Sequence, residues 1–133
     1  MKKNIFLFLI SSFFLIGCAE ESVIEPDIDP KDKFIGTWSV KEEIIGQATQ
    51  NYSSIIVADT SNTSKIKIGN IYNLGAGAKL SALVAGNTLD ISSQVITGIS
   101  IAGTGSYAGT SFILNYTANE GSETINVKAT YTK

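Results

Sequence analysis

The fold is decided by two neighbouring segments, SFILNYTA at residues 111–118 and TINVKATYT at residues 124–132, with the turn sequence NEG at residues 119–121 between them. In both segments every second side chain is apolar or aromatic, and the side chains between them are mostly Ser, Thr, Asn or Lys. A period of two places alternate side chains on the same face of a β-strand. Asn and Gly in a short connection are typical of a turn between antiparallel strands. These residues therefore predict a β-hairpin with one apolar face.

The same alternating pattern continues back along the chain to Phe34, as short runs of alternating apolar and polar residues separated by Gly, Asn, Asp and Ser. The connections are short, and Gly86-Asn87 has the chemistry of a tight turn. No stretch shows a convincing helical period, so we expect little or no helix. The pattern predicts eight strands, at residues 37–45, 53–58, 65–71, 78–85, 88–96, 99–107, 111–118 and 124–132.

Short connections between successive strands indicate a meander in which each strand pairs with its neighbours. Closing such a sheet into a barrel removes the two exposed edges that an open sheet or a sandwich would keep. We therefore expect an all-β domain at residues 34–133, folded as an eight-stranded antiparallel up-and-down β-barrel. The alternation assigns its interior to Trp38, Val40, Ile44, Ile66, Ile68, Leu80, Ala82, Val84, Leu89, Ile91, Ile99, Ile101, Phe112, Leu114, Tyr116, Ile125, Val127, Ala129 and Tyr131.

The beginning of the chain has the pattern of an export signal. Lys2 and Lys3 precede an apolar run at residues 5–16, which is too short to span a bilayer and fits the charged and apolar regions of a secretory signal peptide. The sequence Leu15-Ile16-Gly17-Cys18 resembles the lipobox of bacterial lipoproteins. That resemblance implies that residues 1–17 are removed as a signal peptide and that Cys18, the only cysteine, carries a membrane-anchoring lipid.

Residues 18–33 differ in composition from the rest of the chain. They are short of large apolar residues and contain both prolines, and residues 20–32 carry six acidic side chains against a single lysine. Such a segment cannot bury enough apolar surface to offset its ordering entropy, so we expect an acidic flexible tether. The acidic residues directly after Cys18 also resemble the export signals of outer-membrane lipoproteins. This implies a lipid-anchored protein on the periplasmic or cell-surface face of the outer membrane.

The composition argues against several classes of function. The chain has no arginine and no basic cluster, so the electrostatic footprint of nucleic-acid binding is missing. It has no histidine, which excludes catalytic sites built on an imidazole and argues against a zinc site. No pair of nucleophile and base can be assembled from the remaining residues. We therefore predict neither an enzyme nor a cofactor or metal site.

A second resemblance begins at residues 34–38, FIGTW, where a Gly-x-Trp motif opens the first predicted strand. At the start of an eight-stranded meander this motif resembles the opening of lipocalin and other calycin barrels, in particular of small lipocalin-like domains on bacterial lipoproteins. The segments IAGTG at residues 101–105 and LNYT at residues 114–117 also resemble these domains. The resemblance covers residues 33–133. It implies that Gly36 lets the chain turn tightly into the barrel and that Trp38 plugs one end.

Glu42 is the first candidate for a functional side chain. Strict alternation from Trp38 through Val40 places it on the inward face, where a carboxylate is costly unless it is paired. It could bind a ligand or handle a proton. Alternatively, a bulge or the barrel rim exposes it to water, and we favour this second interpretation because bulges are common near rims.

Further candidates for ligand or partner contacts lie near strand boundaries, on the fifth strand, and in the longest glycine-bearing connection, residues 70–77. We expect that connection to be a mobile rim loop, which contacts a partner or caps the barrel mouth. Ordinary loop and edge packing also explains these side chains, and both interpretations stay open. The candidates are Tyr52, Tyr72, Leu74, Gln94 and Tyr107.

Two classes of function follow from these predictions. The first is a non-catalytic binding module, which takes a small apolar molecule, a glycan or a peptide. The second is an inhibitor or interaction protein that acts on a protease, a lysozyme or another protein partner through a barrel loop. An interior apolar cavity larger than about 300 Å³ would favour the carrier, and a filled barrel with a protruding loop at residues 70–77 would favour the inhibitor.

Overall fold

The structure is a computed structural model that describes residue 17 and residues 27–133. Cys18, most of the predicted signal peptide and the first part of the predicted tether lie outside the described residues. The last part of the tether, residues 29–33, forms backbone hydrogen-bonded turns next to the domain. Within it, Lys33 Nζ donates a hydrogen bond to Asn87 Oδ1 at 2.5 Å. The chain is therefore held against the domain several residues before the first strand.

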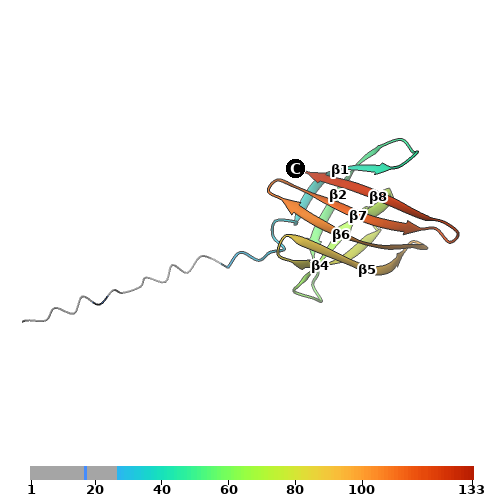
Figure 1. Cartoon of the computed structure of the whole chain (residues 1–133). Helices are drawn as coiled ribbons and strands as arrows, with labels where there is room; N and C mark the ends of the chain where they lie inside the picture. The colour runs from blue at the N-terminus through green and yellow to red at the C-terminus, as the bar shows by residue number, and fades with distance from the viewer. Residues whose placement is uncertain (1–16, 18–26) are drawn as a thin grey trace, which may run out of the picture.

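Eight antiparallel strands form a closed barrel in sequence order, and the last strand pairs with the first (Figure 1). This confirms the all-β, up-and-down barrel that the alternation predicts. Within residues 27–133 the only helical element is the 3-10 turn η1, Ile71–Asn73, and none of the described residues forms a helix long and apolar enough to cross a membrane. The strands are β1 (Gly36–Ile44), β2 (Gln50–Ala58), β3 (Lys65–Gly69), β4 (Lys79–Ala85), β5 (Thr88–Ile96), β6 (Ile99–Ala108), β7 (Ser111–Asn119) and β8 (Thr124–Thr132).

The predicted strand boundaries lie within one residue of the structure except at the start of the second strand and at the end of the third. Strand β2 begins at Gln50, three residues before the predicted start at Ser53. For the third strand the prediction continues to Ile71, whereas β3 ends at Gly69. The reason lies in the backbone of the next residues, because Asn70, Tyr72 and Asn73 have φ values of 53°, 55° and 53°. These left-handed conformations are incompatible with an extended strand and turn the chain into η1.

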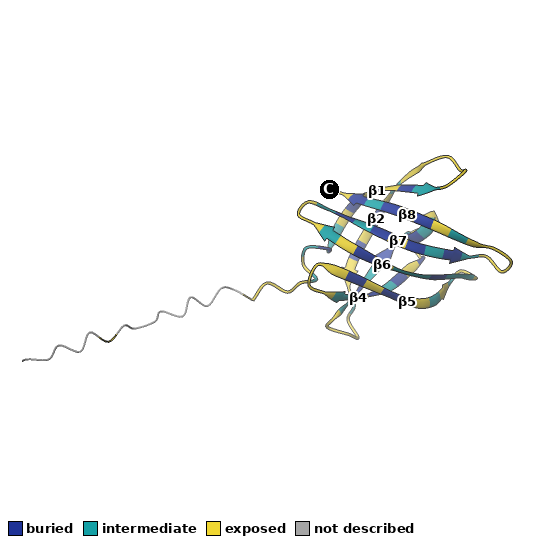
Figure 2. Cartoon of the chain, in the orientation of Figure 1, coloured by how far each residue is buried: buried dark blue, intermediate teal, exposed yellow. Residues whose placement is uncertain are grey.

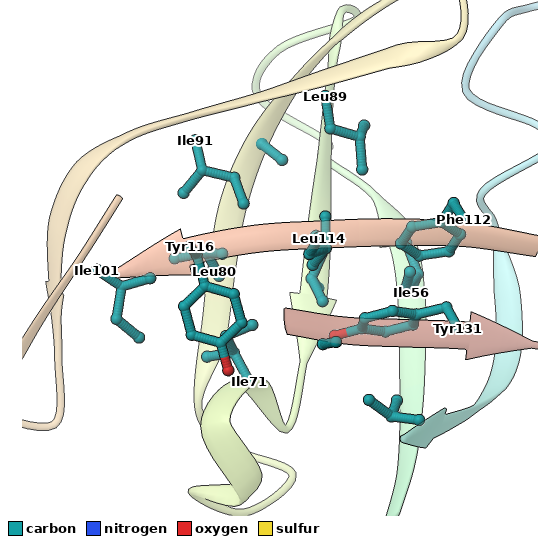
Figure 3. Close-up of a cluster of buried hydrophobic side chains, with 14 of the residues drawn as sticks. Ile56, Ile71, Leu80, Leu89, Ile91, Ile101, Phe112, Leu114, Tyr116 and Tyr131 are labelled. Carbon is teal, nitrogen blue, oxygen red and sulfur yellow. The ribbon is translucent and has the colours of Figure 1, made fainter. Parts of the chain in front are cut away.

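The interior of the barrel is filled by apolar side chains. Buried and exposed residues alternate along the strands (Figure 2), and the buried ones converge in the middle of the barrel (Figure 3). The predicted inward residues are buried, apart from four near strand ends that are only partly buried: Ile44, Val84, Ile99 and Ile125. Strand β2, to which the sequence assigned no inward face, adds Ser54 and Ile56.

One end of the barrel, here called the plugged end, is closed by aromatic side chains. Trp38 Nε1 donates a hydrogen bond to the carbonyl of Phe34 at 2.7 Å, and both rings meet Phe112 edge to face with centroids 4.8 and 5.3 Å away. Gly36 has a φ of 126°, which L side chains rarely adopt. Lys133 Nζ lies 4.5 Å from the centre of the Trp38 ring, so the first and last strands meet here.

Because successive strands are antiparallel, the connections between them lie alternately at the two opposite ends of the barrel. The connections at residues 59–64, 86–87 and 109–110 lie at the plugged end, together with residue 35 and the C-terminus. The opposite end, here called the far end, carries the connections at residues 45–49, 70–78, 97–98 and 120–123. The N-terminal segment thus reaches the barrel on the side that faces away from these four connections (Figure 1).

Candidate functional site: a buried carboxylate and its tyrosines

Glu42 lies inside the barrel and is only 2% exposed. The expectation that a bulge or the rim exposes it is therefore wrong. Strand β1 pairs regularly with β2 from Gly36 to Glu42 and with β8 from Ser39 to Ile44, so neither neighbour introduces the extra residue that would turn the side chain outward. The strict alternation through Trp38 and Val40 places Glu42 as the third inward residue of the strand.

Two tyrosine hydroxyl groups hold the Glu42 side chain. Tyr52 Oη, on the neighbouring strand β2, donates a hydrogen bond to Glu42 Oε2 at 2.5 Å. Tyr116 Oη, on β7, donates to the same oxygen at 2.7 Å. Within residues 27–133, Oε1 receives no hydrogen bond and no lysine forms an ion pair with Glu42, because the described ion pairs join Lys31 to Asp29, Lys41 to Glu43 and Lys67 to Asp59. The carboxylate is thus buried without a positive partner.

These tyrosines stay protonated over the ordinary pH range. Burial raises the pKa of Tyr116 far above its usual value, and the nearby Tyr52 and Glu42 raise it further. Burial is also the main cause that raises the pKa of Tyr52, with contributions from Tyr131 and Glu42. Both hydroxyl groups therefore remain hydrogen-bond donors to the carboxylate.

A third tyrosine adds an unsatisfied group to the same region. Tyr131, on β8, is fully buried, and its hydroxyl group has no hydrogen-bond partner in the part of the chain that the structure describes. The hydroxyl of Ser54, which is also buried, donates to the carbonyl of Gly69 at 2.6 Å and not to Tyr131. Burial and, after it, the charge of Glu42 raise the pKa of Tyr131. Figure 3 shows the hydroxyl groups of Tyr116 and Tyr131 inside the barrel among apolar side chains. We call Glu42, Tyr52, Tyr116 and Tyr131 the Glu42 cluster.

The connection at residues 70–78 covers the far end next to this cluster. Ile71 is fully buried, and Tyr72 and Leu74 are partly buried against the core. The Tyr72 ring meets the Tyr116 ring edge to face with centroids 6.4 Å apart, and Tyr72 Oη donates to Glu120 Oε1 at 3.2 Å. Of the two expectations for this loop, the structure fits a cap on the barrel mouth.

The loop keeps its shape through one asparagine side chain. Asn70 Nδ2 donates to the carbonyl of Ser53 at 2.9 Å, and Asn70 Oδ1 accepts from the backbone N–H of Gly75 at 2.7 Å. These bonds hold the left-handed backbone at Asn70, Tyr72 and Asn73. Asparagine adopts this conformation more readily than most residues, so the cost falls mainly on Tyr72. The cap is therefore a built structure with stored backbone strain.

Gln94 and Tyr107 do not join the cluster. Gln94 Oε1 accepts from the backbone N–H of Ser81 at 2.9 Å, and its Nε2 donates to the carbonyl of Ser81 at 2.8 Å. The side chain thus replaces a backbone rung between β4 and β5 beside a bulge that begins after Ile91. Tyr107 packs on Phe34 at the plugged end, where its hydroxyl donates to the carbonyl of Gly109 at 2.6 Å.

The structure therefore brings together Glu42, Tyr52 and Tyr72 from the predicted candidates, with Leu74 on the same loop. Sequence reasoning placed Tyr116 and Tyr131 in the core but did not assign them to the site. A signal for them was present: a tyrosine on an inward face needs a hydrogen-bond partner for its hydroxyl, and Glu42 was the one inward acid.

Two grooves are present on the outer wall. One, of about 640 Å³, crosses β6, β7, β8 and β1 and is lined mainly by outward residues such as Asn115, Thr117 and Lys128. The other, of about 320 Å³, lies over β2, β3 and β4 beside the exposed Ile55 and Val57. Neither groove is a chamber inside the barrel.

The comparisons with known proteins establish the architecture alone. No protein-family model matches the chain, and no curated protein matches it either. Among solved structures, a redesigned β-barrel is similar with a TM-score of 0.57, over 80% of this chain and 96% of that one, at 14% sequence identity. At that identity the likeness shows the barrel fold and nothing about its ligand.

Proposed function

We propose that the chain is a non-catalytic binding module of a lipoprotein with a lipocalin-like barrel, which is anchored in the outer membrane by a lipid on Cys18 and takes its ligand at the far end. One observation carries this proposal. The N-terminal segment reaches the barrel at the plugged end, and the Glu42 cluster lies under the cap at the opposite end. A barrel held by its N-terminus would therefore present the cluster away from the membrane.

The packing of the interior favours the far end over a central chamber. Trp38, Phe112 and Tyr131 are among the largest side chains of the core and are fully buried. Gly103 and Gly105, on the inward face of β6, leave space that Tyr116 and Leu114 occupy, so a Cβ on Gly105 would lie 2.6 Å from Leu114 Cδ2. This interior is occupied by the protein's own side chains, which counts against a carrier with a central chamber, although the loop at residues 70–77 packs on the mouth and does not have the protruding form expected of an inhibitor. A binding module with this interior would take its ligand at the mouth.

The polar cluster itself supports a binding role. A buried carboxylate without a positive partner lowers stability, because its desolvation penalty of several kcal/mol is only partly offset by hydrogen bonds. Groups that break the rules of core packing in this way are concentrated at functional sites. The groups that contact the carboxylate are two tyrosine hydroxyls. Burial raises the pKa of both, which makes them poor nucleophiles, so binding is the better supported role.

The anchor is tested by replacing Cys18 in the full chain, Cys18→Ala, in a Gram-negative host supplied with labelled fatty acid. The original chain should acquire the label and sediment with outer membranes, and the variant should lose both properties because the acceptor thiol is gone. A matched variant, Ser22→Ala, should keep both. A Cys18→Ala chain that is still labelled and still sediments with membranes would refute the anchor.

A protein partner is the second candidate, in which the chain acts as an inhibitor or interaction protein. It is favoured by Ile45, which is 97% exposed on the β1–β2 connection, and by Val95, which is 69% exposed near the end of β5. Both lie toward the far end. Purified chain should then inhibit a lysozyme or a protease, and Ile45→Asp should abolish the inhibition while Ile55→Asp, on the outer wall, leaves it intact. If both variants inhibited equally well, the far end would not be the surface that binds the protein partner.

A further inference from the structure

We propose that the Glu42 cluster is a recognition site for an organic ammonium group, carried either by a free alkylamine or by a lysine side chain. The inference rests on the proposed function, because it names the chemistry of the ligand taken at the far end. It starts from charge: Glu42 is buried, and no lysine among the described residues forms an ion pair with it. A ligand that brings one positive charge would complete the site.

The hydrogen-bond inventory points to a donor. Both tyrosine hydroxyls donate to Oε2, and Oε1 receives no hydrogen bond from residues 27–133. The buried Tyr131 hydroxyl is also without a partner, and it lies close enough to Glu42 for the carboxylate charge to act on it. An alkylammonium group has three N–H donors and no acceptor, which matches the free acceptor positions of the cluster.

The surrounding rings point to the same class of ligand. The hydroxyl groups of Tyr52 and Tyr116 converge on the carboxylate, and the Tyr72 ring of the cap packs against Tyr116. An organic cation that enters beside these rings would gain cation–π attraction where it meets a ring face. A divalent metal is a poor alternative, because Glu42 is the only carboxylate of the cluster and no three potential metal ligands gather within the described residues.

The way the β3–β4 hairpin is attached gives a route to the site. It pairs with β2 through three residue pairs at Ile56–Ala58 and with β5 through three pairs at Leu83–Ala85. Nearer the far end, side-chain hydrogen bonds attach the hairpin in place of backbone pairing. Asn70 donates to the carbonyl of Ser53, and Gln94 donates to the carbonyl of Ser81. Opening of the cap at residues 70–78 would therefore break few backbone hydrogen bonds, and its main costs would be the exposure of Ile71 and the loss of the bond from Asn70 to Ser53.

The test is a titration of the purified full chain, with tyrosine rings labelled for NMR, by n-butylammonium chloride. The rings of Tyr52, Tyr72 and Tyr116 should shift saturably, and n-butanol and sodium chloride at matched concentrations should not produce this shift. Tyr107, at the opposite end, is an internal control and should not respond. Glu42→Gln should weaken the apparent affinity by about tenfold or more, because it removes the charge that the ammonium group meets.

The matched control is Glu43→Gln, which alters the adjacent outward carboxylate paired with Lys41 and should leave the affinity unchanged. If Glu42→Gln perturbs the fold, Tyr72→Leu removes an aromatic face from the cap without touching the core carboxylate and should weaken binding several-fold. Equal affinity in the original chain, Glu42→Gln and Tyr72→Leu would overturn the proposal, as would the absence of any shift with butylammonium.

Two peptide arms separate the sources of the ammonium group. A blocked Gly-Lys-Gly peptide should reproduce the shifts if the ligand is a lysine side chain, and the same peptide with acetylated lysine should not. Butylammonium binding without peptide binding assigns the site to a free amine, and binding of either supports the proposal. If neither butylammonium nor the lysine peptide binds, this inference is overturned. Membrane attachment through Cys18 is tested by its own experiment and would not be affected by that result.

Discussion

Removing the Glu42 carboxylate together with the two tyrosine hydroxyl groups that donate to it should make the protein at least as stable as it is now. The perturbation is the triple variant Glu42→Leu, Tyr52→Phe, Tyr116→Phe, which deletes the carboxylate and the two hydroxyl groups that donate to it. Leu and Phe keep nearly the volume and shape of the residues they replace. The packing around the cluster is therefore retained while the carboxylate and its two hydrogen-bond donors are removed, and Tyr131 is unchanged.

The expected magnitudes follow from the number of groups left without partners. Glu42→Leu alone orphans the hydroxyls of Tyr52 and Tyr116, and each orphaned group costs about 1–3 kcal/mol. The loss is partly offset because the buried charge is gone, so we expect a net destabilisation of about 1–3 kcal/mol. The triple variant leaves no such orphans, and replacing a buried charged group with apolar side chains is often neutral or stabilising by about 1–4 kcal/mol.

The assay is urea unfolding at pH 7, followed by the fluorescence of Trp38, the only tryptophan, which is buried at the plugged end. Glu43→Leu serves as the surface control and should change the free energy of unfolding by less than about 0.5 kcal/mol. A triple variant that is less stable than the original by more than about 1 kcal/mol would refute the reasoning. The cluster would then be a net source of stability, and its presence would no longer argue for a binding role.

Three further predictions test other parts of the structure. The hydroxyls of the buried Tyr116 and Tyr131 and of the partly buried Tyr52 have pKa values raised above the 10.0 of an exposed tyrosine, so their contribution to stability is complete below pH 10 and declines above it, by about 1.4 kcal/mol per pH unit for each tyrosine. Urea midpoints at pH 9, 10 and 11 should therefore fall, and a constant midpoint would contradict the burial of these groups. Gly105→Ala should destabilise the barrel by about 1–3 kcal/mol in a thermal melt, because its Cβ would overlap Leu114, while Gly77→Ala, which meets no atom within 4 Å, should change little. Gln94→Leu should speed hydrogen exchange at the Ser81 amide and cost about 1–2 kcal/mol, whereas Gln47→Leu, exposed in the β1–β2 connection, should leave that amide unchanged.

The strands were predictable because the signal that defines them is local. Alternation with a period of two, broken by turn residues, gives both the strand positions and the inward faces, and Trp38, Leu114 and Tyr131 follow it. The end of β3 was not predictable in the same way. It depends first on the left-handed backbone of Asn70, a residue type that is enriched in this conformation but usually adopts others. Tyr72, which is also left-handed, is a residue type that gives no warning of it.

The site was only half predictable for a related reason. Alternation alone placed Glu42 inside, and the expectation of a bulge was wrong because β1 pairs without interruption on both sides. Its partner Tyr116 is 74 residues away in the sequence, and their contact is set by the registers of strands across the barrel. Gln94 acquired its role from a bulge in β5 that moves its side chain toward Ser81. A single sequence carries no local signal for any of these registers.

The pairing of β1 with β8 has a consequence for how the molecule forms. Because the first and last strands are direct neighbours, ring closure joins residues that are more than eighty positions apart, and it must wait for the last strand. Contacts of such long sequence separation slow folding, since the entropy of closing the whole chain is lost late. Lys133 Nζ also reaches the carbonyl of Ile35 at 3.0 Å. A short linker could therefore join the two ends of the domain, and a circular permutant opened at residues 120–123 should still close the same ring.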